Sequence, residues 1–230
     1  MLRSLVGSEM CIRDRFKMSL FLPPISPVKD SATGRTVQPP TLTPYKEITL
    51  QEVYKLITSS ERLKTLTETV RRAAENGDEK AYRMLKQQTL PYVTPCGVFS
   101  YRKSDSLTGP SGLIVVDIDH LDSRGEAEKL KRQLFDDRLL RPVLAFTSPG
   151  GRGVKAFIPY DLARIPDTRQ NTSENIHWAM NYVQAIYDSH PDGEDKKTNR
   201  SGKGVDRSGK DLVRACFLSY DEEALIRREI

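Results

Sequence analysis

Two aspartates one residue apart end the most apolar stretch of the chain, GLIVVDID at residues 112–119. Because a strand alternates its side chains between two faces, Ile114, Val116 and Ile118 point one way, whereas Asp117 and Asp119 share the other face. Two carboxylates on one face repel each other unless a cation lies between them, and hard oxygen ligands suit Mg²⁺ or Mn²⁺. The pair predicts a divalent metal site. The alternative is an aspartate pair that closes a strand and caps the next turn.

A second group of charged residues lies between residues 196 and 210, where six basic side chains accompany the single acid Asp206. The basic residues are Lys196, Lys197, Arg200, Lys203, Arg207 and Lys210. They are interleaved with glycine and serine, so the segment cannot bury itself, and it carries the charge that phosphate groups attract. The basic composition of this loop predicts contacts with single-stranded nucleic acid. The alternative is a solvated surface loop.

Composition limits the class of protein. The chain has 230 residues, of which 37% are hydrophobic and 29% charged, which predicts one well-buried globular domain with appended segments. The net charge of +5 and the pI near 9.0 are compatible with a polyanionic partner. No apolar run reaches the roughly 20 residues of a membrane span, and no secretory signal begins the chain, so we expect a cytoplasmic protein without a membrane partner. The few cysteines and histidines lack the spacing of a zinc site or a disulfide framework.

The N-terminal part divides into three segments. Residues 1–15 resemble the translated read-through of a sequencing adaptor, so we expect them to add nothing to the fold. Residues 16–48 contain six prolines and predict an extended linker. Residues 49–90 predict three helices, because Thr49 and Glu52 form a capping box, Asn76-Gly77 ends a second helix and Asp78 caps a third.

Residues 91–230 predict an α+β core. Residues 91–101 indicate an edge strand or a piece of a hairpin. The remaining pattern indicates strands at 113–119, 142–147, 153–159 and 212–219, and helices at 123–136 and 173–190. The order β-α-β-β-α-β is that of the ferredoxin-like and RNA-recognition-motif-like folds. The chain ends at Glu229-Ile230 in what indicates the start of a helix, so we expect a core truncated at its C-terminus.

This topology predicts which segments meet. The first strand is central, and its C-terminal end lies beside the N-terminal ends of the third and fourth strands, so Asp117 and Asp119 should face the loops that precede those strands. Lys155 should share their face of the sheet. The residues expected to converge there are Ser148, Gly150, Gly151, Arg152, Lys155, Asp206, Asp211 and Arg214.

The convergence suggests phosphoryl or nucleotidyl transfer. Asp117, Asp119 and Asp206 are candidate ligands for two metal ions, which would stabilise the attacking and leaving oxygens. The Gly150-Gly151 turn can present N–H groups to phosphate oxygens, and Arg152 adds positive charge. A tight hairpin between strands requires such glycines as well.

Four ordered segments carry a resemblance to a known family: LPYVTPCGVFSYR, GLIVVDIDHL, FTSPGGRGVKAFIP and VDRSGKDLVRACFLSYD. Together, over roughly residues 86–221, they are similar to the VirE N-terminal domain family of bacterial mobile elements, which in turn resembles the archaeo-eukaryotic primase superfamily. The resemblance implies a primase-polymerase core whose acid-x-acid motif falls on Asp117 and Asp119. It places the third acid on Asp206, with Asp211 as the other option, and Arg214 downstream.

This chain differs from the second motif of that superfamily. A Ser-x-His is usual there, with the histidine on the phosphates of the incoming nucleotide, but Ser148 is followed by a glycine turn and Lys155 takes the histidine position. A lysine binds phosphate as a point charge. The resemblance therefore implies Mg²⁺ or Mn²⁺, nucleoside triphosphates, a single-stranded template and a possible helicase domain beyond this segment.

Two other hypotheses are alternatives to a primase-like enzyme. The first is a catalytically silent nucleic-acid-binding or regulatory module with the same fold, which Lys155 favours. The second is a phosphatase of the haloacid-dehalogenase type, whose strand also ends in Asp-x-Asp. That family expects Thr or Val where this chain has Leu121, and its sheet is doubly wound.

Overall fold

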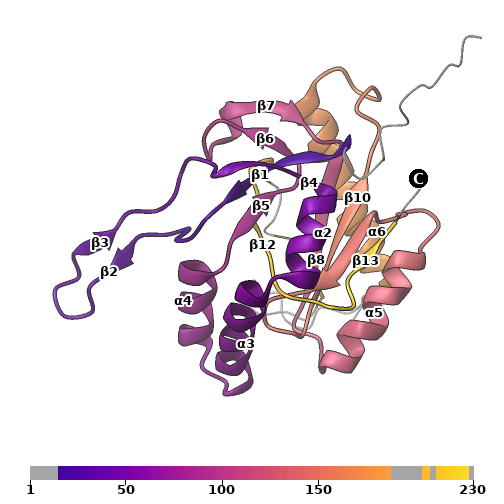
Figure 1. Ribbon diagram of the computed structural model, residues 1–230. Helices are drawn as coiled ribbons and strands as arrows, with labels where there is room; N and C mark the ends of the chain where they lie inside the picture. The colour runs from indigo at the N-terminus through magenta and orange to yellow at the C-terminus, as the bar shows by residue number, and fades with distance from the viewer. Residues whose placement is uncertain (1–14, 188–203, 208–210, 228–230) are drawn as a thin grey trace, which may run out of the picture.

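The computed structural model describes residues 15–187, 204–207 and 211–227. Its main sheet has five strands in the order β11-β8-β10-β9-β13, and every neighbouring pair is antiparallel (Figure 1). The strands are β8 (Leu113–Asp119), β9 (Leu144–Thr147), β10 (Val154–Pro159), β11 (Gly204–Val205) and β13 (Leu225–Ile226). With the helices α5 (Arg124–Asp136) and α6 (Thr168–Tyr187), β8 to β11 form the expected βαββαβ unit, so the α+β class is confirmed.

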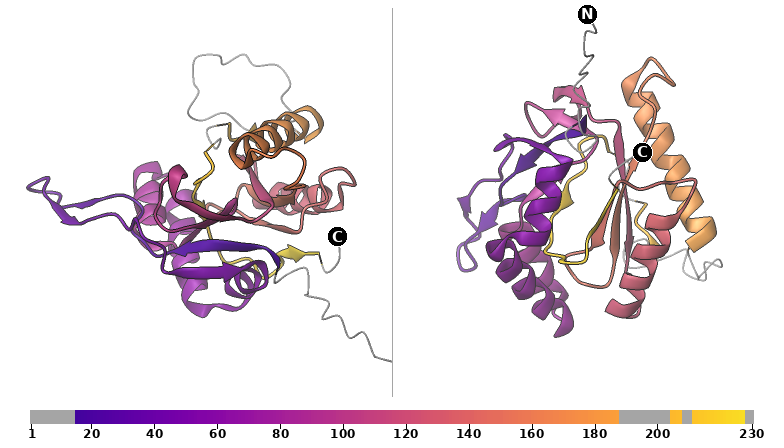
Figure 2. Two further views of the ribbon diagram at one scale, coloured as in Figure 1. Left: turned by 90° about the horizontal axis from the view of Figure 1, so that it is seen from above. Right: turned by 45° about the vertical axis from the view of Figure 1, so that its right-hand side comes forward.

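The strand β8 is apolar on both faces because both faces are covered. Ile114, Val116 and Ile118 pack against α5 and α6. Leu113 and Val115, which share the face of the two aspartates, pack in a second core formed with the N-terminal elements. Figure 2 shows the sheet between these two layers. The expected helix at 123–136 is confirmed, with Ser123 as its cap and Ala127, Leu130 and Leu134 buried.

A second sheet, in the order β12-β5-β1-β4, is built mainly from the N-terminal part of the chain and lies beside the main sheet. Its strands are β1 (Lys17–Phe21), β4 (Lys46–Thr49), β5 (Tyr92–Thr94) and β12 (Cys216–Phe217). The two-stranded pairs are β2 (Val28–Lys29) with β3 (Thr36–Gln38), which projects from the body in Figure 1, and β6 (Gly97–Phe99) with β7 (Leu107–Pro110). A short 3₁₀ helix, η1 (Ser104–Ser106), precedes β7.

Two expectations differ from these strands. The range 16–48 was predicted as a linker, yet it contains β1, an inner strand whose Met18 and Phe21 are fully buried. The range 212–219 was predicted as the fourth strand of the core. Only Cys216–Phe217 is a strand there, and it pairs with β5 in the second sheet, whereas Gly204–Val205 takes the place beside β8. Strand propensity could not distinguish these partners, because pairing is decided by tertiary packing.

The three expected N-terminal helices are present as α2 (Leu50–Ser59), α3 (Glu61–Glu75) and α4 (Glu79–Thr89). The capping box of Thr49 and Glu52 and the cap by Asp78 are confirmed. The helix α4 has no buried residue, unlike α2 and α3. Within the described residues, no helix has the length and apolar character needed to cross a membrane.

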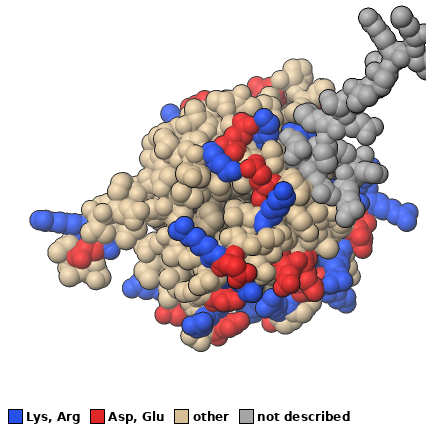
Figure 3. Space-filling model, viewed as in Figure 1, with Lys and Arg blue, Asp and Glu red and all other residues tan. Residues whose placement is uncertain are grey.

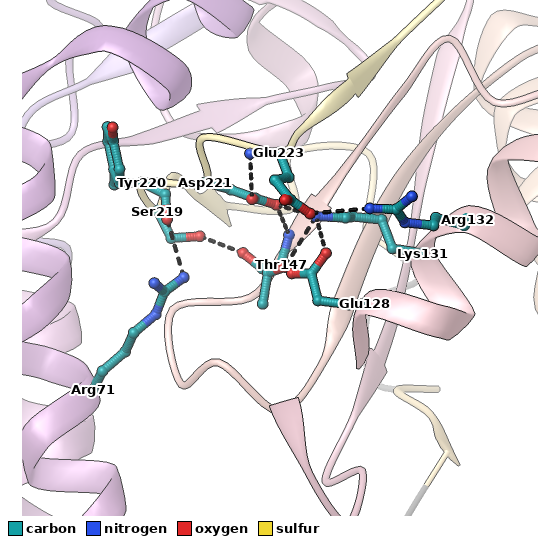
Figure 4. A network of polar contacts seen from close by, with 9 residues as sticks. All are labelled: Arg71, Glu128, Lys131, Arg132, Thr147, Ser219, Tyr220, Asp221 and Glu223. Atoms are coloured by element: carbon teal, nitrogen blue, oxygen red, sulfur yellow. Dashed lines mark hydrogen bonds and ion pairs between the residues drawn. The ribbon is translucent and has the colours of Figure 1, made fainter. Parts of the chain in front are cut away.

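A buried polar network holds the segment that follows β12 (Figure 4). Lys131 Nζ of α5 is fully buried and lies 2.8 Å from Asp221 Oδ2 and 2.7 Å from Glu128 Oε2. Thr147, at the end of β9, donates its N–H to Asp221 over 2.8 Å, and Ser219 Oγ donates to the carbonyl oxygen of Thr147 over 2.6 Å. The network therefore ties the chain after β12 to both α5 and β9.

We expect Lys131→Met to lower the free energy of unfolding by about 3–5 kcal/mol, because removing one partner of a buried ion pair leaves the other charge uncompensated. Burial opposes ionisation of Asp221, but the Lys131 contact outweighs it and lowers the pKa of that carboxyl. The stabilisation is thus present above the unfolded pKa of 3.8 and is lost as pH falls through the folded value. Denaturant unfolding at several pH values measures it. Lys129→Met, at an exposed position of α5, is the control and should change stability little.

Candidate functional site

A chain of ion pairs lies at the C-terminal end of β8. Asp117 pairs in register with Lys155 of β10, and the two residues are only 4% and 7% exposed. Lys155 Nζ donates to Asp117 Oδ1 over 2.8 Å. Arg214 Nη2 donates to Asp117 Oδ2 over 2.6 Å and to Asp206 Oδ2 over 2.8 Å. The expectation that Lys155 shares the face of Asp117 is therefore confirmed.

The two aspartates of β8 are in opposite electrostatic states. Burial disfavours the charged form of Asp117, but Lys155 and Arg214 outweigh it and hold the pKa of that carboxyl well below its usual range. Asp119 forms no hydrogen bond or ion pair with the described residues. Burial raises its pKa, and the charges of Asp117 and Asp206 add to that shift. Asp119 is thus the carboxyl that a cation would stabilise most.

A cavity of about 250 Å³ opens above these groups. We call it the first cavity. Its charged lining comprises four carboxylates and three cations. Tyr82, Phe217, Pro149 and Ala215 complete the wall. The charged residues are Asp117, Asp119, Asp206, Asp211, Lys86, Lys155 and Arg214. The expected convergence of β8, Lys155 and the 206–214 segment is therefore present, and Asp206 and Asp211 both reach the cavity.

A neighbouring cavity of about 230 Å³, the second cavity, shares Tyr82, Lys86 and Asp119 with the first. The helix α4 and the glycine turn form its walls. Its other lining residues are Ala74, Glu79, Arg83, His120, Ser148, Gly150 and Arg152. Ser148, Gly150 and Arg152, which the sequence placed with the nucleotide, therefore lie in this second space. Gly151 lines neither cavity.

Close packing explains two glycines of the turn. A Cβ on Gly150 would lie 3.1 Å from the hydroxyl oxygen of Tyr82. A Cβ on Gly153 would lie 2.5 Å from the carbonyl oxygen of Ile118 and 2.7 Å from Asp119 Oδ1, closer than side chains approach. Gly151 has a φ of +77°, which favours glycine. The turn thus has structural reasons for its glycines, and these do not depend on phosphate.

The helix α4 supplies residues that the sequence interpretation missed. Lys86 Nζ lies 4.9 Å from the ring centre of Tyr82 and 5.6 Å from that of Phe217. No carboxylate of the described residues is within ion-pair distance of it, and burial, together with Lys155, lowers its pKa. Tyr82 and Lys86 are one helical turn apart and so share a face. That i, i+4 spacing of an aromatic and a basic residue was the signal available in the sequence.

Arg214 and Tyr82 bring hydrogen-bond donors to the first cavity. Arg214 Nη1 has no hydrogen-bond partner among the described residues. Burial raises the pKa of Tyr82 to about 12, and the nearby Asp119 carboxylate adds to the shift. The phenol is therefore protonated at neutral pH and can donate. A guanidinium N–H, a lysine and a phenol around one space can receive an anionic oxygen.

A protein cage for a metal ion does not fit the described residues. Both oxygens of Asp117 are engaged by cations, and Asp206 shares Arg214. Within the described ranges, no group of three or more His, Cys, Asp or Glu side chains is arranged to hold a metal. The predicted ligand set of Asp117, Asp119 and Asp206 is thus brought to one cavity without forming such a group. Of these three, Asp119 alone has no ion-pair partner among the described residues.

Most of the predicted nucleic-acid loop lies outside the described residues, namely Lys196, Lys197, Arg200, Lys203 and Lys210. Arg207 is described. Its Nε donates to Gln184 Oε1 over 2.7 Å, and its Nη2 donates to Asn181 Oδ1 over 3.0 Å, so it lies against α6. On the face in Figure 3, basic and acidic side chains are interspersed. The described residues on that face therefore show no separate basic patch.

These features define an α+β domain with a ferredoxin-like sheet and a charged cavity at the end of its first strand. The model of the BT4734-like N-terminal domain family matches residues 84–225, and the chain belongs to that family. No curated protein and no solved structure matches the chain. The matched family carries a different name from the VirE N-terminal domain suggested by the sequence. That resemblance and the link to primases stay predictions.

The contrast between the two aspartates predicts stability changes of opposite sign. Asp117→Asn should lower the free energy of unfolding by about 3 kcal/mol, because Lys155 and Arg214 lose a buried counter-charge. Asp119→Asn should raise the melting temperature at neutral pH, because it removes a buried charge that folding disfavours. The gain should be absent below pH 3.8, where the carboxyl is protonated in both states, and should grow as pH rises through the raised folded pKa. Thermal unfolding at pH 3 to 8 tests both, and destabilisation by both variants would contradict it.

Proposed function

We propose that the domain binds a nucleoside triphosphate with its divalent cation in the first cavity, as part of a primase-like protein that acts on single-stranded nucleic acid. The observation that carries the proposal is the lining of this cavity. The lining includes the carboxyl of Asp119, which has no ion-pair partner among the described residues, together with Lys86, Arg214 Nη1 and the rings of Tyr82 and Phe217. A carboxylate for a cation, donors for phosphate and aromatic faces for a base match a metal–nucleotide.

The proposal needs no preformed metal cage. Mg²⁺ is commonly held by one or two carboxylates together with the phosphates of a substrate, and it keeps several of its waters. Asp119 fits the part of such a carboxylate. The cation then arrives with the nucleotide, which agrees with the absence of a three-ligand group among the described side chains.

The cationic side chains suit the phosphates for different reasons. Lys86 is desolvated and has no carboxylate partner among the described residues, so a phosphate would supply its missing counter-charge. Lys155 was expected from the sequence as the triphosphate anchor. Its ammonium is held by Asp117 over 2.8 Å, and this contact raises its pKa against the effect of burial. We therefore assign the principal phosphate contact to Lys86, and to Lys155 the task of holding Asp117.

We expect Lys86→Ala to weaken Mg·ATP binding about 10-fold or more, the effect of losing a charge-assisted contact of about 1.5–3 kcal/mol. Asp119→Asn should remove the gain in affinity that Mg²⁺ produces while keeping the metal-free affinity. Titration with a fluorescent ATP analogue, with Mg²⁺ or with EDTA, measures both. Lys80→Ala and Asp136→Asn alter exposed residues that line neither cavity and should bind as the wild type. Equal affinities for all five proteins would overturn the proposal.

A second candidate is the catalytically silent binding module, and the buried Lys155–Asp117 pair favours it. That pair neutralises the carboxylate that a two-metal mechanism requires. Nucleotide incorporation on a single-stranded template separates the two. We expect Mg²⁺- or Mn²⁺-dependent extension that Asp119→Asn abolishes. Binding of nucleotide without extension under both metals would establish the silent module instead.

A further inference from the structure

We propose that the second cavity binds a phosphodiester of a single nucleic-acid strand, next to the nucleotide in the first cavity. The proposal rests on the proposed function, because it names the partner of the adjoining space. The two cavities share Tyr82, Lys86 and Asp119, so a ligand in one lies against a ligand in the other. The binding of strands was expected from the 196–210 loop. Most of that loop lies outside the described residues. Among the described residues, the cations that line the second cavity come from α4 and the glycine turn.

The charge of the second cavity differs from that of the first. Its lining has three cations, Arg83, Lys86 and Arg152, and two carboxylates, Glu79 and Asp119. The first cavity has three cations against four carboxylates, and two of those cations are already held in short ion pairs. An anion without its own metal is therefore better accommodated in the second cavity than in the first.

Arg83 and Arg152 of the second cavity have hydrogen-bond donors that no strong ion pair with the described residues occupies. Arg83 has only a 3.6 Å contact with Glu79, and both side chains are more than 60% exposed. Such a surface pair is worth little and yields readily to a phosphate. Arg152 donates its Nε to the carbonyl oxygen of Leu121 over 2.8 Å, which fixes the guanidinium beside the cavity. No carboxylate of the described residues lies within ion-pair distance of Arg152, so its terminal amino groups are without a counter-charge there.

A diester suits this site better than a second metal–triphosphate. Asp119 is the only carboxyl at the junction of the cavities, and the cation of the nucleotide would occupy it. The remaining cationic donors come from two elements, Arg83 from α4 and Arg152 from the glycine turn. Two guanidinium groups from different elements can contact the phosphates of one strand. Contacts of this kind position a strand without reading its bases.

The test is fluorescence anisotropy of a labelled 20-nucleotide oligo(dT) in EDTA at several salt concentrations. Without metal, binding of the metal–nucleotide does not contribute. We expect Arg83→Ala and Arg152→Ala each to weaken binding about fivefold, and each to flatten the slope of log affinity against log salt by about 0.7, the contribution of one single-strand phosphate. The matched control Lys80→Ala, an exposed lysine of the same helix, should leave affinity and slope unchanged.

Mg·ATP affinity, measured on the same variants, distinguishes failure of this inference from failure of the proposed function. Arg83→Ala should bind Mg·ATP within twofold of the wild type. If the arginine variants bind oligo(dT) as the wild type does, the strand site is overturned whatever the nucleotide result. If they lose oligo(dT) while no protein binds Mg·ATP, the strand site stands and the nucleotide proposal fails. Unchanged melting temperatures exclude misfolding, and Arg83→Glu, at a largely exposed position, should weaken binding further.

Discussion

The pairing of Asp117 with Lys155 is the interaction on which the rest of the site depends. The two residues face each other across β8 and β10, and both are buried, so neither charge is tolerated without the other. Arg214 adds a second cation to Asp117 and thereby connects the 206–214 segment to the sheet. Because Lys155 and Arg214 are engaged by Asp117, the neighbouring Asp119 has no ion-pair partner among the described residues.

The N-terminal elements complete this arrangement. The strands β1 and β4 and the helices α2 and α3 bury the sheet face that carries the two aspartates. The helix α4 continues that layer past the end of β8 and places Tyr82 and Lys86 over the carboxylates. The family match begins at residue 84, within this helix. Tyr82, Arg83 and the elements that position α4 thus lie before the matched segment.

The buried network around Lys131 also helps to position the lining of the first cavity. It holds Ser219 and Asp221 against β9 and α5. Arg71 of α3 reaches the same segment, donating to the carbonyl oxygen of Tyr220 over 3.0 Å. The chain between β11 and this anchor carries Arg214 and Phe217, which form a wall of the first cavity. The contacts of Lys131, Thr147 and Ser219 fix the segment because losing one of them would leave a buried polar group unsatisfied.

Local signals in the sequence determined much of this molecule. Alternation along 113–119 placed Asp117 and Asp119 on one face, and capping residues located α2 and α4. The order of elements predicted the split βαβ unit that the sheet adopts. These features depend on neighbours a few residues apart. The tertiary structure alone decided which segment pairs beside β8, that β1 is an inner strand, and that Lys86 and Tyr82 face the carboxylates. Those outcomes depend on how segments distant in the sequence pack against one another, and local sequence patterns do not determine that packing.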